Sequence, residues 1–310
     1  MERFLPPSKT ASSARLPLTH LLLAVVITAV WGTNFVVIRG ALQSFPPLFF
    51  ALLRFAFVFL PAALFIKRPR TAWRDLILYG TLTGGGQFGL LYVAMGGYIS
   101  PGLASLVVQS QVFFTVAIAI VTTSEKLSRH HAAAAALALC GLLIIGNKAG
   151  GEATPAGLAM TLLAGLSWAV ANIIMRRGTG GNMLGYIVWS SPFSILPLAL
   201  LSLTLEGPRA IAHALAIAGP GAWLAVLWQS SGNTLFGFAI WGWLLRQHPA
   251  ATVTPVALLI PVFGLLSSAL FLGEPLQSWK VVAAALILLG LAVNLLGGRL
   301  SRSPLASHSP

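Results

Sequence analysis

Long uninterrupted apolar runs constrain this chain more than any other feature. Ten of them are nearly free of charge: residues 17–38, 47–66, 76–98, 102–122, 131–147, 155–175, 183–204, 221–244, 251–272 and 278–297. A helix needs about 20 mostly apolar residues to cross the hydrocarbon of a bilayer. Because the runs are continuous and do not alternate at every second residue, they predict helices and not membrane strands. We predict an all-α membrane protein with ten transmembrane helices.

The composition excludes several classes of protein. Only 8% of the 310 residues are charged, whereas soluble domains carry about a quarter. The net charge of +13 comes from residues at the ends of apolar runs, so no continuous patch for nucleic acid forms. The sequence has no zinc-protease motif, nucleophile elbow or phosphate-binding loop. We expect no enzyme activity, no cofactor and no metal site.

The lysines and arginines set the expected orientation. With the N-terminus in the cytoplasm, the outer segments hold only Arg39, Lys148, Arg209 and Lys280, and most other basic residues fall on the cytoplasmic side. Cytoplasmic loops of membrane proteins carry an excess of basic residues. Both termini are therefore predicted to be cytoplasmic, which agrees with an even number of spans.

The two halves of the chain resemble each other. Several patterns recur in the same order: Trp31 to Arg39 with Trp168 to Arg176, Pro61 to Leu64 with Pro197 to Leu200, Glu125-Lys-Leu127 with Glu274-Pro-Leu276, and Ala134 to Gly141 with Ala283 to Gly290. Five helices per repeat place the second copy upside down in the membrane, a recurrent plan of secondary transporters. A longer outer loop near 205–220 accounts for the change in offset between the repeats.

These observations divide the chain into four parts. We predict a cytoplasmic tail at residues 1–16, a first five-helix repeat at 17–148, an inverted second repeat at 155–297 and a cytoplasmic tail at 298–310.

The ordered motifs resemble the drug/metabolite transporter superfamily, its EamA-type exporters and, among these, the YddG-type exporters of aromatic and neutral amino acids. The resemblance rests on Trp31-Gly-Thr-Asn34-Phe35, Arg54, the two Glu-x-Leu motifs and Pro261-Val-Phe263. It implies that helices 1–4 and 6–9 surround a central cavity, with helices 5 and 10 at the periphery. One departure is Val112, which replaces the expected proline and predicts a straighter fourth helix than the ninth.

Polar and aromatic residues inside the spans are the candidate site. The predicted substrate-binding residues are Trp31, Asn34, Gln87, Tyr92, Gln109, Trp168, Asn172, Asn233 and Trp241. Polar groups in hydrocarbon tend to face the bundle interior. Amides donate and accept hydrogen bonds, so they suit neutral or zwitterionic solutes. The alternative is that these amides only tie helices together.

Arg54 is a charged residue in the interior of a predicted span, residues 47–66. It has three possible roles: binding a substrate carboxylate, binding backbone carbonyls, or extending to an interface. We favour a gating or structural role.

The six acids all fall outside the spans or at their ends. Membrane proton relays generally use acids or histidines within the bundle. We expect a monomeric, multi-pass inner-membrane transporter that exports small neutral or zwitterionic metabolites, including aromatic amino acids, by alternating access without an intramembrane carboxylate. The alternatives are an exporter of other amphipathic metabolites or drugs, and a membrane protein that does not transport.

Overall fold

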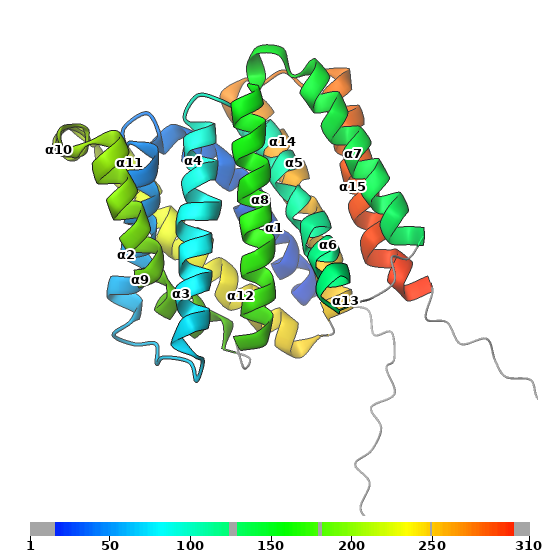
Figure 1. Cartoon of the computed structure of the whole chain (residues 1–310), viewed down its shortest axis with the longest axis horizontal. Coiled ribbons are helices and arrows are strands. Elements are labelled where there is room, and N and C mark those ends of the chain that lie inside the picture. The colour runs from blue at the N-terminus through cyan, green and yellow to red at the C-terminus, as the bar shows by residue number, and fades with distance from the viewer. Residues whose placement is uncertain (1–15, 124–128, 179–181, 249, 301–310) are drawn as a thin grey trace, which may run out of the picture.

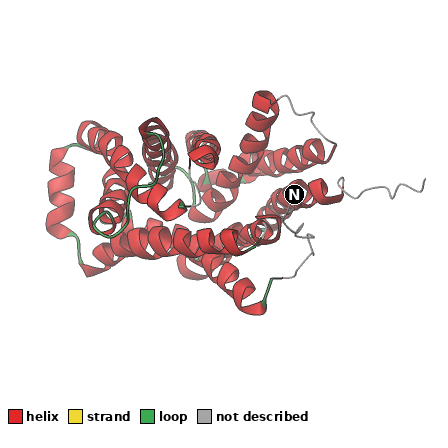
Figure 2. Ribbon diagram, turned by 90° about the horizontal axis from the view of Figure 1, so that it is seen from below, coloured by secondary structure: helices red, strands yellow, loops and turns green. Residues whose placement is uncertain are grey.

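The computed structural model describes residues 16–123, 129–178, 182–248 and 250–300. These residues form helices joined by short loops (Figure 2), and their extended pairing is a single antiparallel bridge between Ile99 and Ala153. The all-α prediction is thus confirmed for the described residues. Most of the two predicted tails, and Glu125 of the first Glu-x-Leu motif, lie outside them.

The described residues of the first half form seven α-helices. They are α1 (Leu18–Ala41), α2 (Pro47–Ala62), α3 (Trp73–Thr81), α4 (Leu90–Met95), α5 (Pro101–Val107), α6 (Gln111–Thr123) and α7 (Arg129–Lys148). The π-helical segment η1 (Leu82–Gly89) joins α3 to α4. The 3₁₀ turn η2 (Val108–Ser110) joins α5 to α6, and a second one, η3 (Gly150–Glu152), follows α7. The fourth predicted helix therefore changes its winding although it lacks the proline.

In the second half, the part that the structure describes forms eight α-helices. They are α8 (Pro155–Gly178), α9 (Met183–Leu201), α10 (Pro208–Ile217), α11 (Pro220–Leu227), α12 (Gly237–Gln247), α13 (Ala250–Val253), α14 (Leu259–Leu272) and α15 (Ser278–Leu300). The π-helical segments are η4 (Ser202–Glu206) after α9 and η5 (Trp228–Phe236) between α11 and α12. The 3₁₀ segment η6 (Thr254–Leu258) joins α13 to α14.

Proline sets several of the helix starts. Pro47, Pro101, Pro155, Pro208 and Pro220 are each the first residue of a helix. The first turn of a helix leaves its N–H groups without intrahelical partners, so a residue that lacks this group costs nothing there, and its fixed φ favours the helix.

Length and hydropathy separate the helices that can cross a membrane. Seven helices of the described residues qualify, or eight if the bent pair Pro208–Ile217 and Pro220–Gln247 counts as one span. The apolar helix Pro47–Ala62 is shorter than these. The predicted count of ten is not established by these criteria.

The predicted outer loop near 205–220 contains the helix α10, which was not predicted. Gly207 has a φ of +86°, a conformation that glycine adopts without strain, and Pro208 then begins the helix. The chain bends by 107° between α10 and the segment that begins at Pro220. Figure 1 places α10 at the opposite end of the molecule from α7 and α15.

Helices at matching places in the two halves pack against each other. The pairs are α2 with α9, α5 with α14, and α7 with α15, the last visible side by side in Figure 1. Glycines permit the contact of α7 with α15, because a Cβ on Gly141 would lie 2.9 Å from the Ala283 carbonyl oxygen and one on Gly290 would lie 2.7 Å from that of Ala134. Small residues let helices approach closely.

Glutamates from the second half cap helices of the first. Glu206 accepts the N–H groups of Leu48 (2.6 Å) and Phe49 (3.0 Å) at the start of α2. Glu274 accepts the Ser100 hydroxyl (3.0 Å) and the Gly102 N–H (3.3 Å) at the start of α5. Both carboxylates accept hydrogen bonds from N–H groups that a helix start leaves without partners. Their negative charge also interacts favourably with the positive end of the helix dipole.

Candidate functional site

A buried polar network centred on Arg54 joins α2, α4 and η5. Arg54 is only 1% exposed. Its guanidinium donates to the hydroxyls of Tyr92 (3.0 Å) and Thr234 (3.2 Å). It also donates to the amide oxygens of Gln229 and Asn233, each at 3.0 Å. All four acceptors are neutral.

Asn34 connects the network to α1. Its amide exchanges two hydrogen bonds with that of Gln229, at 3.3 and 2.8 Å. The Gln229 oxygen also accepts the Tyr92 hydroxyl at 3.1 Å, so one oxygen serves three donors. Buried networks of this kind hold their members in fixed positions when every group is satisfied.

Aromatic rings enclose the guanidinium. The Arg54 Cζ atom lies 3.8 Å from the ring centroid of Phe88, a cation–π contact. Tyr92 stacks on Phe50 at 5.3 Å between centroids. These rings exclude water from the polar network and favour the positive charge.

Two π-helical segments occupy the middle of the helical runs that contribute to this region. η1 lies between α3 and α4, and η5 lies between α11 and α12. The Thr234 hydroxyl donates at 2.7 Å to the backbone oxygen of Gln229, five residues earlier. Such wide turns are rare and frequently mark functional sites.

Trp31 and Trp241 pack beside the network. The Trp31 indole N–H donates to the backbone oxygen of Asn233 at 3.1 Å, and the two indole rings lie 5.2 Å apart. Gly237 makes room for this contact, because a Cβ there would lie 2.6 Å from the Trp31 Nε1 atom. Trp31 thus anchors α1 on η5 and α12.

The remaining predicted residues lie elsewhere. Asn172 donates to the Gln111 side-chain oxygen at 3.3 Å, which links α8 to α6. Trp168 packs against the largest apolar cluster. Gln87 and Gln109 are each 5% exposed, and neither side-chain amide has a hydrogen-bond partner among the described residues.

The EamA-like transporter family matches this chain twice, over residues 18–147 and 155–296. The chain belongs to the EamA-like transporter family. It is accordingly a multi-pass protein of the inner membrane. Membership of a transporter family indicates a transporter and not an enzyme.

Relatives of this EamA-like transporter span nearly its whole length. A protein of Salmonella typhimurium named "Probable amino-acid metabolite efflux pump" is 39% identical over 91% of this chain and 96% of its own. Its namesake from Escherichia coli is 37% identical, over 89% and 95%. A "Probable terminal-alkyne amino-acid exporter" of Streptantibioticus cattleyicolor is 25% identical over 86% and 91%.

A solved structure shares the fold of this EamA-like transporter. A crystal structure at 21% identity matches with a TM-score of 0.60 and covers 94% of this chain and all of that chain.

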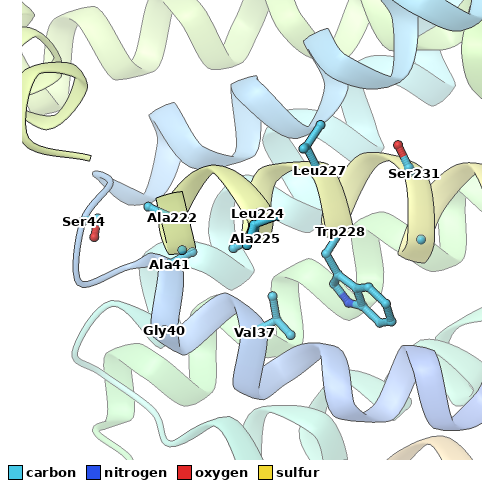
Figure 3. Close-up of a pocket in the computed structure, with 12 residues that line it drawn as sticks. Val37, Gly40, Ala41, Ser44, Ala222, Leu224, Ala225, Leu227, Trp228 and Ser231 are labelled. Atoms are coloured by element: carbon cyan, nitrogen blue, oxygen red, sulfur yellow. The ribbon is translucent and has the colours of Figure 1, made fainter. Parts of the chain in front are cut away.

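The EamA-like transporter also carries a surface groove, separate from the polar network. It has a volume of about 730 Å³ and runs between the C-terminal half of α1 and the segment α11–η5. Figure 3 shows the indole of Trp228 reaching toward α1 beside Val37. None of the nine predicted substrate-binding residues lines this groove.

The predicted residue set for this EamA-like transporter omits two central members of the network. Gln229 and Thr234 contact Arg54 directly, and neither is among the predicted site residues. The spacing of Gln229 four residues before Asn233 was an available signal, because such residues share one face of a helix. Thr234 gave no comparable signal, because a threonine hydroxyl in an apolar helix commonly donates to a backbone carbonyl of the same helix.

Proposed function

We propose that this transporter exports small neutral or zwitterionic metabolites, in particular amino acids with apolar or aromatic side chains. The observation that carries the proposal is the acid-free network of Arg54, Asn34, Gln229, Asn233 and Tyr92, which combines a buried cation with amides and aromatic rings. Such groups suit a molecule with a carboxylate, an ammonium and an apolar side chain. The names of its relatives agree with this substrate class.

The transport cycle would be alternating access between two inverted repeats of five helices, residues 17–148 and 155–297, in a single copy of the chain. This arrangement is supported by the family model, which matches each half of the chain separately. It is also supported by the packing of α2 on α9, of α5 on α14 and of α7 on α15. Matching helices pair with each other when two halves share a two-fold axis. Similar halves give inward-open and outward-open states of similar energy.

The topology would be ten spans with both termini in the cytoplasm. Besides the helices long and apolar enough to cross, Pro47–Ala62 and the helical run from Trp73 to Met95 would also span. Cysteine labelling tests this. In a Cys140→Ser background, an impermeant thiol reagent should label Arg209→Cys from outside in intact cells and label Arg70→Cys only after lysis. The reverse pattern would contradict the orientation.

The other polar residues would line the substrate path. Gln87 and Gln109 are strong candidates, because both are buried and neither amide is engaged among the described residues. Trp31, Trp168, Asn172 and Trp241 would complete the walls and fix the helices around them.

Transport into proteoliposomes tests the proposal. Reconstituted protein should take up labelled phenylalanine or leucine down its gradient. Asn34→Ala and Trp168→Ala should reduce the rate at least tenfold. Asn147→Ala and Trp73→Ala serve as matched controls, because these side chains are exposed and remote from the network. Uptake of amphipathic drugs but of no neutral amino acid would favour the second candidate function.

No coupling to protons is expected, because the acids of the sequence fall outside the predicted spans. Uptake should therefore be unchanged when a protonophore collapses the proton gradient. Strict dependence on that gradient would overturn this part of the proposal.

A further inference from the structure

We infer that Arg54 is the binding site for the carboxylate of the substrate, and that the amide oxygens of Gln229 and Asn233 occupy that site when it is empty. The inference rests on the proposed function and extends it. It assigns the central arginine a ligand and links ligand binding to the movement of one helix.

The charge of Arg54 has no carboxylate partner among the described residues. Asp75 lies at the start of α3, Glu152 pairs with Lys280, and Glu206 and Glu274 cap helix starts. A cation that is 1% exposed and held only by neutral groups has lost its hydration without gaining a counter-charge. It therefore favours an incoming anion over the dipoles that surround it.

Geometry indicates where that anion binds. The two terminal nitrogens of the guanidinium each donate at 3.0 Å to one amide oxygen, Nη1 to Gln229 and Nη2 to Asn233. Two oxygens on the two terminal nitrogens mimic a carboxylate that binds arginine in a bidentate manner. A substrate carboxylate would take both positions and replace hydrogen bonds to neutral oxygens with a bidentate ion pair, which adds the attraction between opposite charges.

The displaced amides are then available to the rest of the substrate. The Asn233 oxygen becomes a free acceptor, while the Gln229 oxygen loses one of its three donors and keeps Asn34 and Tyr92. Both oxygens lie beside the Tyr92 hydroxyl and the Phe88 ring, which contact Arg54. Acceptor oxygens and an aromatic face bind an ammonium group. The same exchange therefore creates a site for the second charge of a zwitterion.

Binding would also release a helix. Gln229 and Asn233 both belong to η5, whereas Arg54 belongs to α2. Losing both hydrogen bonds leaves the Thr234 hydroxyl as the remaining acceptor of Arg54 on η5, so fewer contacts hold the π-helical segment to α2. A segment wound as a π-helix is a natural point of flexure. Carboxylate binding is thus coupled to movement of the α11–η5–α12 segment.

The experiment compares ligands that differ only in the carboxylate. Purified full-length protein in proteoliposomes takes up labelled phenylalanine, and unlabelled phenylalanine, phenylalaninamide and phenethylamine compete. We expect phenylalanine to compete at least tenfold better than the other two. A difference in affinity of this order is expected from the loss of one bidentate ion pair. The Arg54→Lys variant keeps the positive charge but loses the two terminal nitrogens that bind a carboxylate together. It should therefore reduce the advantage of phenylalanine over the two competitors that lack the carboxylate. Arg209→Lys, on an exposed site of α10, should leave it unchanged.

A second variant separates binding from folding. Asn233→Asp supplies an internal carboxylate to Arg54, so the protein should unfold at a higher temperature in detergent and should no longer take up phenylalanine. If Arg54 served only to hold the helices together, the same variant would be more stable and still active, which would overturn the inference. Equal competition by phenylalanine and its amide would overturn it while leaving the exporter function intact. A wild-type protein that takes up no neutral amino acid would remove the proposed function and this inference together.

Discussion

Lys280 forms an ion pair with Glu152 although only 1% of the lysine side chain is exposed, whereas 24% of the glutamate side chain is. The ammonium also donates to the backbone oxygen of Pro275 at 2.8 Å. The two partners thus differ in their access to water. Removing one or the other should therefore lower the free energy of unfolding by different amounts.

Removing the glutamate should be more damaging than removing the lysine. Glu152→Gln leaves a buried ammonium without its counter-charge, and we expect a loss of about 3 kcal/mol in the free energy of unfolding. Lys280→Met leaves a carboxylate that water can reach, and it should cost less. Unfolding of the purified variants in detergent measures both. Equal losses, or a greater loss for Lys280→Met, would contradict the reading.

Glu274 should make stability depend on pH. Burial raises the pKa of this carboxyl above its ordinary value of 4.5, and the hydrogen bonds from Ser100 and Gly102 oppose that shift only in part. The protonated form is favoured in the folded state, so the stabilisation is present below pH 4.5 and is lost as the pH rises through the folded pKa.

The Glu274→Gln variant tests this dependence because it keeps an oxygen acceptor and cannot ionise. Its melting temperature relative to wild type should rise as the pH increases from 4.5 and should level off above the folded pKa. Thermal unfolding in detergent across a pH series gives both curves. A difference that stays flat or falls over that range would argue against the raised pKa.

Two glycines on α7 should respond differently to a single methyl group. A Cβ on Gly141 would lie 2.7 Å from the Ile287 side chain and 2.9 Å from the Ala283 carbonyl oxygen, whereas Gly146 on the same helix has open space. Gly141→Ala should therefore destabilise the contact with α15 by about 1–3 kcal/mol. Gly146→Ala should be neutral or slightly stabilising, because alanine favours a helix. Comparable losses for both would contradict the close packing.

Adjacent glycines in η1 offer a second matched pair. A Cβ on Gly84 would lie 2.5 Å from the Cα atom of Ser194, and one on Gly85 would lie 3.9 Å from Pro197. Gly84→Ala must push η1 away from α9, and we expect transport to fall at least tenfold. Gly85→Ala should transport like wild type. Proteoliposome uptake distinguishes them, and full activity of Gly84→Ala would show that this contact is dispensable.

The helices could be predicted from the sequence because burial in lipid leaves a continuous apolar signal. The break between the predicted runs 76–98 and 102–122 is found between Met95 and Pro101. The helix α10 was not predicted, because a ten-residue amphipathic segment lacks the length of a span and its proline and glycine also suit a loop. The π-helical winding of η1 and η5 has no equivalent in hydrophobic periodicity.

The candidate site was predictable only in part. Arg54 is conspicuous in the sequence because a charge within an apolar run is costly. Its pairing with them is not, since Tyr92 and Gln229 lie 38 and 175 residues away along the chain and meet Arg54 only through the packing of helices. Asn34, Tyr92 and Asn233 were predicted as site residues and do belong to the network, whereas Asn172 joins a different pair of helices.

The almost complete burial of the Arg54 network has a consequence for the energy supply of the cell. Water and hydrated ions cross a membrane protein through a continuous wet path, and a centre filled by its own amides blocks a path through that centre. An idle copy would therefore not dissipate the membrane potential or the sodium and proton gradients by this route, so the cell can keep the protein in its membrane between bouts of export.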